Sequence, residues 1–465
     1  MAGEEAGSAA SAPTEIEQDK SNDSVIIDIP VHLEFELWSK SCIQRVPRKL
    51  RKVKEAAYTP QLLSIGPFHH GKTELLGMEH HKRRYFDELC RRTGKKQADL
   101  KHFIRGRHEE ILQSYAGTVE FRKEVFLDIV LIDACFILEL FLRNSENRED
   151  DYIRRTPWLR KDIEQDLVLL ENQLPYAFLM QLYDFVATPE PHSEATGDSG
   201  TENDKNPELV PLLSTQHHNK NESFHPFSKH TRDFFSYARH AEASEVDAIK
   251  HFTDLVRQAL CPKKILPSEN NISNLYSATK LDLAGVRLTP YQNPRLTELE
   301  MVSGRFSFCC IPCIPGLKST QLKLPEFEVQ DDTECLLRNV MALEQCQYPY
   351  EAYICNYILL LDQLIDDTKD VDLLVEKKIV RNLLGSNEFV AKLINKLCDQ
   401  IVVTNSCYYE VSEELNALTE NCCIRTKAMI KRVYFKDCWT ASSAIVGFFV
   451  LVFSVSATIK ALFFK

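Results

Sequence analysis

The chain has 465 residues, of which 44% are hydrophobic and 26% are charged, so it is not a wholly disordered chain, a fibre or a pore of many spanning helices. Its 56 basic and 67 acidic residues give a net charge of −11. General nucleic-acid binders are usually basic, so we expect no nucleic-acid partner.

Residues 1–40 are predicted to form a disordered N-terminal tail. The first 24 residues are acidic and small, without the basic start and apolar run of a secretory signal. They also lack the Arg-rich, acid-poor character of a transit peptide. We therefore expect the globular body to begin near residue 41.

Residues 41–186 are predicted to form an N-terminal helical half. Apolar residues recur at helical spacing over residues 78–89, 100–112, 125–141 and 163–185. The stretch at 125–141 is too apolar for a surface helix and predicts a central core helix. The short apolar run at residues 62–65 is expected to form a strand.

A polar, acidic and turn-rich stretch at residues 187–224 is predicted to be a disordered insert. A C-terminal helical half then covers residues 225–438. Its expected helices lie at residues 234–260, 334–344, 348–365, 371–384, 388–403 and 412–434. Strand signals are confined to residues 305–311 and 322–324. The predicted fold class is mainly α, a large helical body with few short strands, followed by one C-terminal transmembrane helix.

The C-terminal segment, residues 439–464, is predicted to be a transmembrane anchor. Residues 439–459 contain no charged side chain, and about 20 apolar residues at a rise of about 1.5 Å span the hydrocarbon core of a bilayer. A buried strand is the alternative, but no sequence follows that could cover it. The expected membrane residues include Trp439, Ile445, Phe448, Phe449, Phe453 and Ile459.

Flanking charges predict the orientation of this anchor. Basic residues immediately precede it, whereas only two follow its centre; they are Lys427, Lys431, Arg432 and Lys436 before it, and Lys460 and Lys465 after. By the positive-inside bias we expect the body of the protein, N-terminal to the anchor, to be cytosolic. We expect a single-pass, tail-anchored protein of the plasma membrane or an endomembrane. The Asn-x-Ser sequons at Asn22, Asn221 and Asn271 would be used only if the bulk were lumenal.

A glycine-rich loop allows a nucleotide-binding hypothesis. Residues 66–73, Gly-Pro-Phe-His-His-Gly-Lys-Thr, fit the spacing of a phosphate-binding loop. Such a loop needs a preceding strand, a following helix and free backbone N–H groups. Pro67 has no N–H, and Phe68, His69 and His70 are bulky for a phosphate cradle. A turn packed by aromatic and His side chains is the favoured interpretation, and a switch acting through Lys72 is an alternative.

Carboxylates inside apolar runs allow a second alternative, a hydrolase. They are Asp128, Asp133, Glu139, Asp166 and Glu171. A pair such as Asp133 and Glu171 could perform acid–base chemistry. A buried charge also needs a partner, so a structural network is favoured, with Arg83, Arg84 and Arg122 as candidate partners.

We expect no metal and no cofactor. The 15 cysteines are odd in number and scattered, which favours reduced core thiols over a disulfide framework. Cys309, Cys310 and Cys313 contain a single Cys-x-x-Cys, whereas structural zinc usually takes two such pairs. The histidines at 69, 70, 80 and 81 lack further ligands apart from Glu79.

Seven motifs occur in order along the chain. They include Ser-Ile-Gly-Pro-Phe-His-His-Gly at 64–71, Met-Glu-His-His-Lys at 78–82, Asp-Ala-Cys-Phe-Ile-Leu-Glu at 133–139 and Leu-Leu-Glu-Asn-Gln-Leu-Pro at 169–175. The motif positions are Gly66, Pro67, His69, His70, Glu79, Lys82, Asp133, Cys135, Glu139, Asp166, Glu171, Asn172, Gln173, Pro175, Arg338, Asn339, Glu344 and Gln345. These motifs resemble the plant family called domain of unknown function 247. The chain departs from the pattern at Ala134, usually Gly, and at Lys280, usually Glu.

The resemblance implies identity more than chemistry. The family has no established catalytic activity, and some grass members look like pollen-side determinants of self-incompatibility. It therefore implies a membrane-associated protein of recognition or signalling, and it favours an interaction protein over an enzyme. A protein partner is expected but is not identified by the sequence, and neither is any small-molecule ligand.

Overall fold

The computed structural model describes residues 41–117, 119, 121–188, 225–238, 249–261, 268, 270–292, 295–305, 318–421 and 438–463. The described part is mainly helical with few short strands, as the sequence predicts. The predicted tail at 1–40 lies outside it, as do residues 189–224 of the predicted insert and the three cysteines at 309–313.

The N-terminal half is organised around α6 (Lys123–Ser145), which confirms the core helix predicted at 125–141. Fifteen of its 23 residues are buried, because α3, α4, α9 and α10 all pack against it. The bounds of the N-terminal elements are α2 (Arg48–Val53), η1 (Glu55–Tyr58), η2 (Thr73–Leu75), α3 (Leu76–Thr93), α4 (Gln97–Arg105), α5 (His108–Gln113), α7 (Tyr152–Arg155), α8 (Pro157–Leu167) and α9 (Tyr176–Ala187).

The C-terminal half combines helices with a small mixed sheet. In the three-stranded sheet, β3 (Lys318–Pro325) lies between β1 (Arg287–Tyr291), which is parallel to it, and β2 (Glu300–Arg305), which is antiparallel. The short β4 (Phe327–Val329) and β5 (Val380–Asn382) pair in parallel. The helices are α10 (Pro226–Phe234), η3 (Ser236–Ala238), α11 (Phe252–Leu260), α12 (Ala278–Leu283), α13 (Thr333–Gln347), α14 (Tyr353–Leu364), α15 (Thr368–Glu376), α16 (Asn387–Leu397) and α17 (Tyr409–Glu420).

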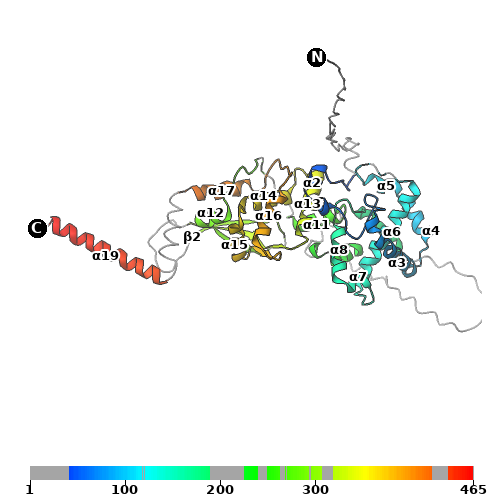
Figure 1. The fold of residues 1–465 in the computed structure, drawn as a ribbon, viewed down its shortest axis with the longest axis horizontal. Helices are drawn as coiled ribbons and strands as arrows, with labels where there is room; N and C mark the ends of the chain where they lie inside the picture. The colour runs from blue at the N-terminus through cyan, green and yellow to red at the C-terminus, as the bar shows by residue number, and fades with distance from the viewer. Residues whose placement is uncertain are drawn as a thin grey trace, which may run out of the picture.

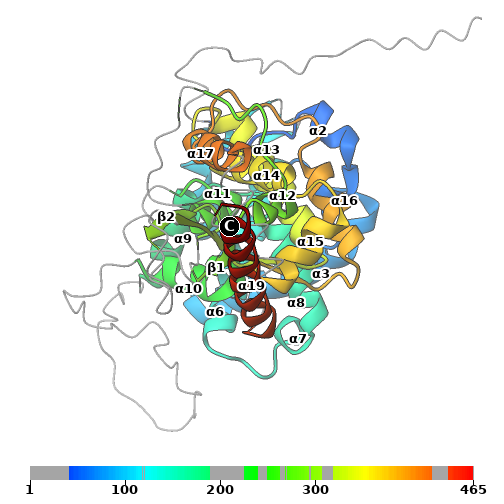
Figure 2. The ribbon, with the colours of Figure 1, turned by 90° about the vertical axis from the view of Figure 1, so that its left-hand side faces the viewer.

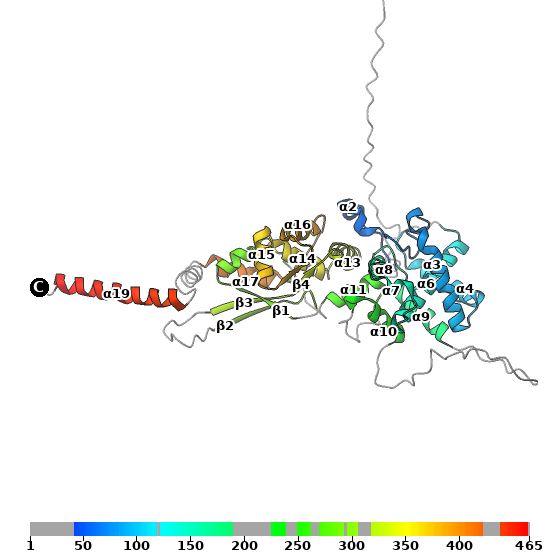
Figure 3. The ribbon, with the colours of Figure 1, turned by 60° about the horizontal axis from the view of Figure 1, so that its bottom comes forward.

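The two halves lie end to end in an elongated body (Figure 1). Helices α3, α4 and α6 occupy one end and α12, α15 and α17 the other, with α11 and α13 between them. The three-stranded sheet runs along one side of the C-terminal helices (Figure 3). One cluster of buried apolar residues continues through both halves, so their cores are in contact.

The last helix, α19 (Cys438–Phe463), differs from every helix of the body. It is 26 residues long, and its stretch Ser442–Lys460 has a mean hydropathy of 2.1 with no part of it buried. Figure 2 views the molecule along this helix, with the body behind it. It is the one helix among the described residues that is long and apolar enough to cross a membrane.

The predicted strand at residues 62–65 is wrong. These residues are not part of any sheet. Their backbone N–H groups donate to side chains instead, as Leu63 N does to Asp166 and Ile65 N to Asn172. A segment whose N–H groups are used in this way has no ladder to join.

Several predicted helices are shorter than their apolar pattern suggests. Residues 163–185 are divided into α8 and α9 by a turn that ends at Pro175, because the residue before Pro avoids the α region. Residues 100–112 are divided at Gly106, and residues 371–384 at Lys378, whose φ is 60°. α11 begins only at Phe252, α16 ends at Leu397 and α17 ends at Glu420. The strand at 322–324 is confirmed within β3, whereas residues 306–311 and 422–434 lie outside the described residues.

Candidate functional site

The family-motif residues of the N-terminal half meet at the loop of residues 61–66. Asp166, at the end of α8, accepts hydrogen bonds from the backbone N–H groups of Gln61, Leu62 and Leu63 at 2.9, 2.7 and 2.8 Å. Asn172 accepts from Ile65 N at 2.7 Å. These two side chains replace the strand partner that the loop lacks.

A buried ion pair ties the same loop to α3 and α6. Lys82 Nζ lies 2.5 Å from Asp133 Oδ1 and donates to the carbonyl of Ser64 at 2.7 Å, while Glu79 lies 2.5 Å away. Asp133 also accepts from Gly66 N at 2.8 Å. Burial opposes the charge of Lys82, but the carboxylates of Asp133 and Glu79 outweigh it and raise its pKa. Lys82 is therefore charged, and these acceptors hold its ammonium group in one position.

Backbone geometry explains the glycine and the amides of these motifs. Gly66 has φ +70°, and a Cβ there would lie 2.7 Å from the carbonyl oxygen of Gln173, so only glycine fits. The Gln173 side chain donates to the carbonyls of Leu167 and Leu169 at 2.6 and 2.7 Å. Pro175 is the residue that precedes α9. The motif at 169–175 is thus a self-capping turn between two helices.

Glu171 points the other way, toward the start of the chain. It accepts from Val46 N at 2.7 Å, lies 2.6 Å from Arg51 and has His69 Nε2 at 3.3 Å. Burial alone would raise its pKa, but His69, Arg51 and Val46 N together lower it to about 2. Burial lowers the pKa of His69, so this histidine is neutral at pH 7.

This depressed pKa predicts part of the acid sensitivity of the fold. A carboxyl that titrates at about 2 when folded and about 4.5 when unfolded stabilises the protein above pH 4.5 and loses that stabilisation as the pH falls. Between about pH 5 and pH 3 the loss from Glu171 is about 2 kcal/mol. Urea unfolding at both pH values should show this loss, and Glu171→Gln should lose less stability over the interval. An equal loss in the variant would contradict the assignment.

The C-terminal motif residues also fasten segments together. Asn339 accepts from Leu170 N at 3.0 Å and donates to the carbonyl of Ala57 at 2.7 Å, which joins α13 to the N-terminal half. Glu344 is fully buried, lies 3.1 Å from Arg257 and accepts from the N–H of Cys355 at 2.9 Å.

The two remaining motif positions of α13 hold neighbouring chain segments. Gln345 makes a two-way pair with the backbone of Val402, at 2.9 and 3.0 Å. Arg338 pairs with Glu334 at 2.9 Å and donates to the carbonyl of Lys396 at 3.1 Å. The motif side chains of α13 therefore fasten several chain segments to this helix.

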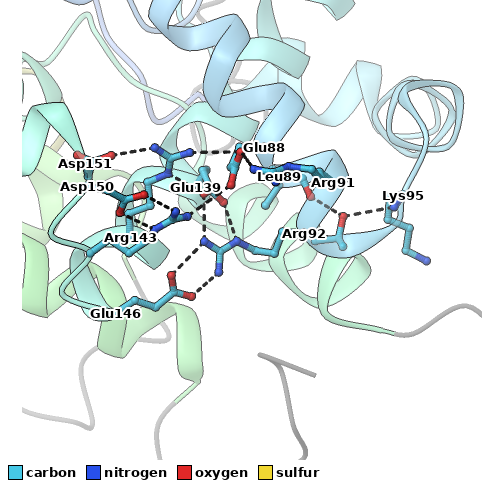
Figure 4. A network of polar contacts seen from close by, with 12 residues as sticks. Glu88, Leu89, Arg91, Arg92, Lys95, Glu139, Arg143, Glu146, Asp150 and Asp151 are labelled. Atoms are coloured by element: carbon cyan, nitrogen blue, oxygen red, sulfur yellow. Dashed lines mark hydrogen bonds and ion pairs between the residues drawn. The ribbon is translucent and has the colours of Figure 1, made fainter. Parts of the chain in front are cut away.

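Glu139 is the centre of a separate charged network between α3, α6 and the segment after α6 (Figure 4). Arg92 contacts Glu139 at 2.9 Å and also pairs with Glu146, and Arg143 contacts Glu139 at 2.7 Å and Asp151 at 2.9 Å. Glu139 is fully buried. Two arginines therefore neutralise one buried carboxylate.

The outer part of this network is more exposed. Glu88 pairs with Arg91 (Figure 4). Glu88 also pairs with Arg148, which in turn pairs with Asp150 at 2.7 Å. Arg143 links the two parts, since it lies 3.9 Å from Glu88. Ion pairs at this level of exposure contribute little to stability. The main effect of this outer part is therefore to fix the orientation of α3 on α6.

These contacts bear on the two interpretations of the carboxylates, a structural network and a hydrolase. Asp133 and Glu171 are ion-paired, Asp166 is bonded to three N–H groups, and exposed Asp128 pairs with Lys101. The predicted partners Arg83, Arg84 and Arg122 are wrong, because Lys82, Arg51, Arg92 and Arg143 take those roles. Asp133 and Glu171 are thus occupied in holding the fold, which does not favour the hydrolase.

The loop at residues 66–73 is a packed turn. Phe68 meets Tyr115 edge-on at 5.4 Å, and His70 meets Phe121 at 6.0 Å, while Pro67 is buried. The N–H of Gly66 already binds Asp133, and α3 begins only at Leu76 after a 3-10 turn. Neither the preceding strand nor the helix start that a phosphate loop needs is formed.

Among the described residues, no group of three His, Cys, Asp or Glu side chains could hold a metal ion. The nine cysteines whose side chains the structure describes are free thiols. Burial raises the pKa of the motif thiol Cys135 well above its usual value, which makes it a poor nucleophile. A surface pocket of about 220 Å³ includes one motif residue, Pro175, in its lining, together with Cys42, Glu110, Phe178 and Lys250.

Sequence reasoning missed the basic partners and one hydroxyl. Arg51, Arg92 and Arg257 lie 47 or more positions from the carboxylates that they contact, and no local signal marks them. Arg143 could have been found, because it is four residues after Glu139 on one helix. Tyr115 donates to the carbonyl of Gln173 at 2.9 Å.

Comparison with known proteins agrees with these motifs. The model of the family DUF247, described as "Plant protein of unknown function", matches residues 43–453. The chain is similar to UPF0481 protein At3g47200 of Arabidopsis thaliana, with 26% identity over 90% of this chain and 86% of that protein. It is also similar to Putative UPF0481 protein At3g02645 of the same plant, with 23% identity over 78% of this chain and 79% of that protein. No solved structure matches it. The chain belongs to the plant family DUF247, whose function is unknown.

Proposed function

We propose that this protein is a membrane-anchored interaction protein, in which α19 holds a helical body at a membrane so that it can recognise or signal to another protein. The observation that carries the proposal is the 19-residue stretch Ser442–Lys460, apolar and wholly unburied. Exposing such a surface to water is costly, because each buried methylene group is worth about 0.8 kcal/mol. A bilayer removes that cost.

The interior of the body supports interaction more than catalysis. The motif carboxylates and amides are bonded to backbone groups or paired with cations. A catalytic group needs an accessible face toward a substrate. The motif residues therefore support a rigid scaffold, whose outer surfaces carry the function.

We propose that the body faces the cytosol, on the plasma membrane or an endomembrane. The four basic residues between positions 427 and 436 favour that side. The side chain of Asn271 is exposed, so its sequon would be available to the glycosylation machinery in a lumenal body.

The experiment is alkaline carbonate extraction of the full chain from plant microsomes, followed by glycosidase digestion. We expect the chain to remain in the membrane pellet, because an inserted helix resists extraction that removes peripheral proteins. We expect no change of mobility after digestion. Release into the supernatant would contradict the anchor, and a shift would contradict the cytosolic orientation.

A further inference from the structure

A dense run of positive charge stands out in an otherwise acidic chain. Residues 45–54, Arg-Val-Pro-Arg-Lys-Leu-Arg-Lys-Val-Lys, hold six cations and no carboxylate, whereas the whole chain has a net charge of −11. None of the six is a family-motif position. Arg51 is bound to the motif residue Glu171, but neither the membrane anchor nor the motif network explains why so many further cations accompany it.

In the structure these residues lie on two sides of α2 and of the short segment, residues 45–47, that leads into it. The apolar side, Val46 and Leu50, is 4% exposed at each residue and packs in a cluster with Leu170, Ala342 and Leu343. The opposite side is exposed to solvent. We name it the α2 cationic face, and it consists of Arg45, Arg48, Lys49 and Lys52.

The other two cations of the run hold α2 in position. Arg51 pairs with Glu171 at 2.6 Å, and Lys54 pairs with Glu334 on α13. The guanidinium of Arg45 lies 4.1 Å from the centre of the Phe68 ring. The α2 cationic face is therefore displayed on a helix that is fixed to both halves of the body, and a preorganised surface loses less entropy on binding.

We propose that the α2 cationic face binds an acidic segment of a partner protein. This deepens the proposed function and rests on it. Among the described residues, no carboxylate pairs with Lys49 or Lys52, although lysines elsewhere, such as Lys101 and Lys392, have partners. Six helical residues extend about 9 Å, which suits a short segment with two or three carboxylates. Complementary charge of this kind steers encounter and sets specificity.

The position of α2 favours a protein partner over a lipid surface. Figures 1 and 2 place α2 away from α17, the last helix before α19 among the described residues. The net negative charge of the chain also disfavours close approach to anionic lipid. Phe68, half-buried beside Arg45, adds an aromatic surface that can contact an apolar residue within an acidic segment.

The test is fluorescence anisotropy with the full chain in neutral detergent micelles and a labelled peptide of alternating Glu and Ala. Lys49→Glu combined with Lys52→Glu should weaken binding by at least about tenfold at low salt. The matched control, Lys229→Glu combined with Lys369→Glu, makes the same charge change at two exposed lysines elsewhere and should stay within about twofold. Unchanged urea unfolding of both variants confirms that they fold.

Three outcomes would overturn the proposal. One is an equal loss of binding in both double variants, which would show a general charge effect. Another is face-dependent binding to vesicles containing phosphatidylserine without binding to the peptide. The third is peptide binding only after residues 1–40, which carry nine acidic side chains, have been deleted. Carbonate extraction of the same variants reports separately on the membrane anchor.

Discussion

Lys82→Met should lower the free energy of unfolding by about 3–5 kcal/mol, because it leaves a buried carboxylate without its cation. Asp133 is 1% exposed and Lys82 is 0% exposed. The substitution also removes the hydrogen bond to the carbonyl of Ser64, so the loop at residues 61–66 loses one of its attachments. Urea unfolding followed by circular dichroism measures the change.

Two controls separate the buried charge from general effects. Lys101→Met removes the cation of an exposed pair with Asp128 and should cost no more than about 1 kcal/mol. Lys82→Met combined with Asp133→Leu removes both charges and should be more stable than Lys82→Met alone. A cost below about 1 kcal/mol for Lys82→Met would show that Asp133 finds another partner or is protonated without penalty.

Two arginines at the centre of α19 should remove the protein from membranes. Val450 and Leu451 lie at the middle of the stretch Ser442–Lys460, where each arginine costs about 2.5–3.5 kcal/mol of insertion free energy. Val450→Arg combined with Leu451→Arg therefore costs about 6 kcal/mol. We expect most of the chain in the supernatant after carbonate extraction.

The matched control places the same two charges at the start of the helix. Trp439→Arg combined with Ser442→Arg should leave the protein in the pellet, because side chains near a helix end reach the interface. Equal release of both variants would indicate that added positive charge, not its depth, disrupts the attachment. Full retention of the central variant would contradict a spanning α19.

Sequence patterns located the elements whose signal is local. α6 is apolar on nearly every side, and α19 is a long uncharged run, so composition alone identifies both. The prediction for residues 62–65 was wrong, because a run of four apolar residues resembles a strand whether or not a neighbouring strand exists. Here the side chains of Asp166 and Asn172 supply the hydrogen bonds.

The sequence showed that the buried motif carboxylates need partners, but it did not show which residues those partners are. A carboxylate inside an apolar run signals that a partner must exist, as Asp133 does. The identity of the partner depends on tertiary packing, which brings Lys82 across 51 positions and Asn339 across 169 to Leu170. The arginines at 83 and 84 are close to these carboxylates in sequence, but they are not their partners in the folded protein. The local pairs lie three or four positions apart on one helix, where the sequence can show them; they are Lys82 with Glu79, Glu139 with Arg143 and Arg338 with Glu334.

The most direct test of the central claim is deletion of residues 438–465 from the full chain, followed by fractionation of plant cells. The remaining body keeps its motif network, since the contacts described for that network lie within residues 41–421. We expect the deleted chain to be folded and recovered in the soluble fraction, whereas the full chain remains with membranes. A folded, deleted chain that still pellets with membranes and resists carbonate would contradict this expectation.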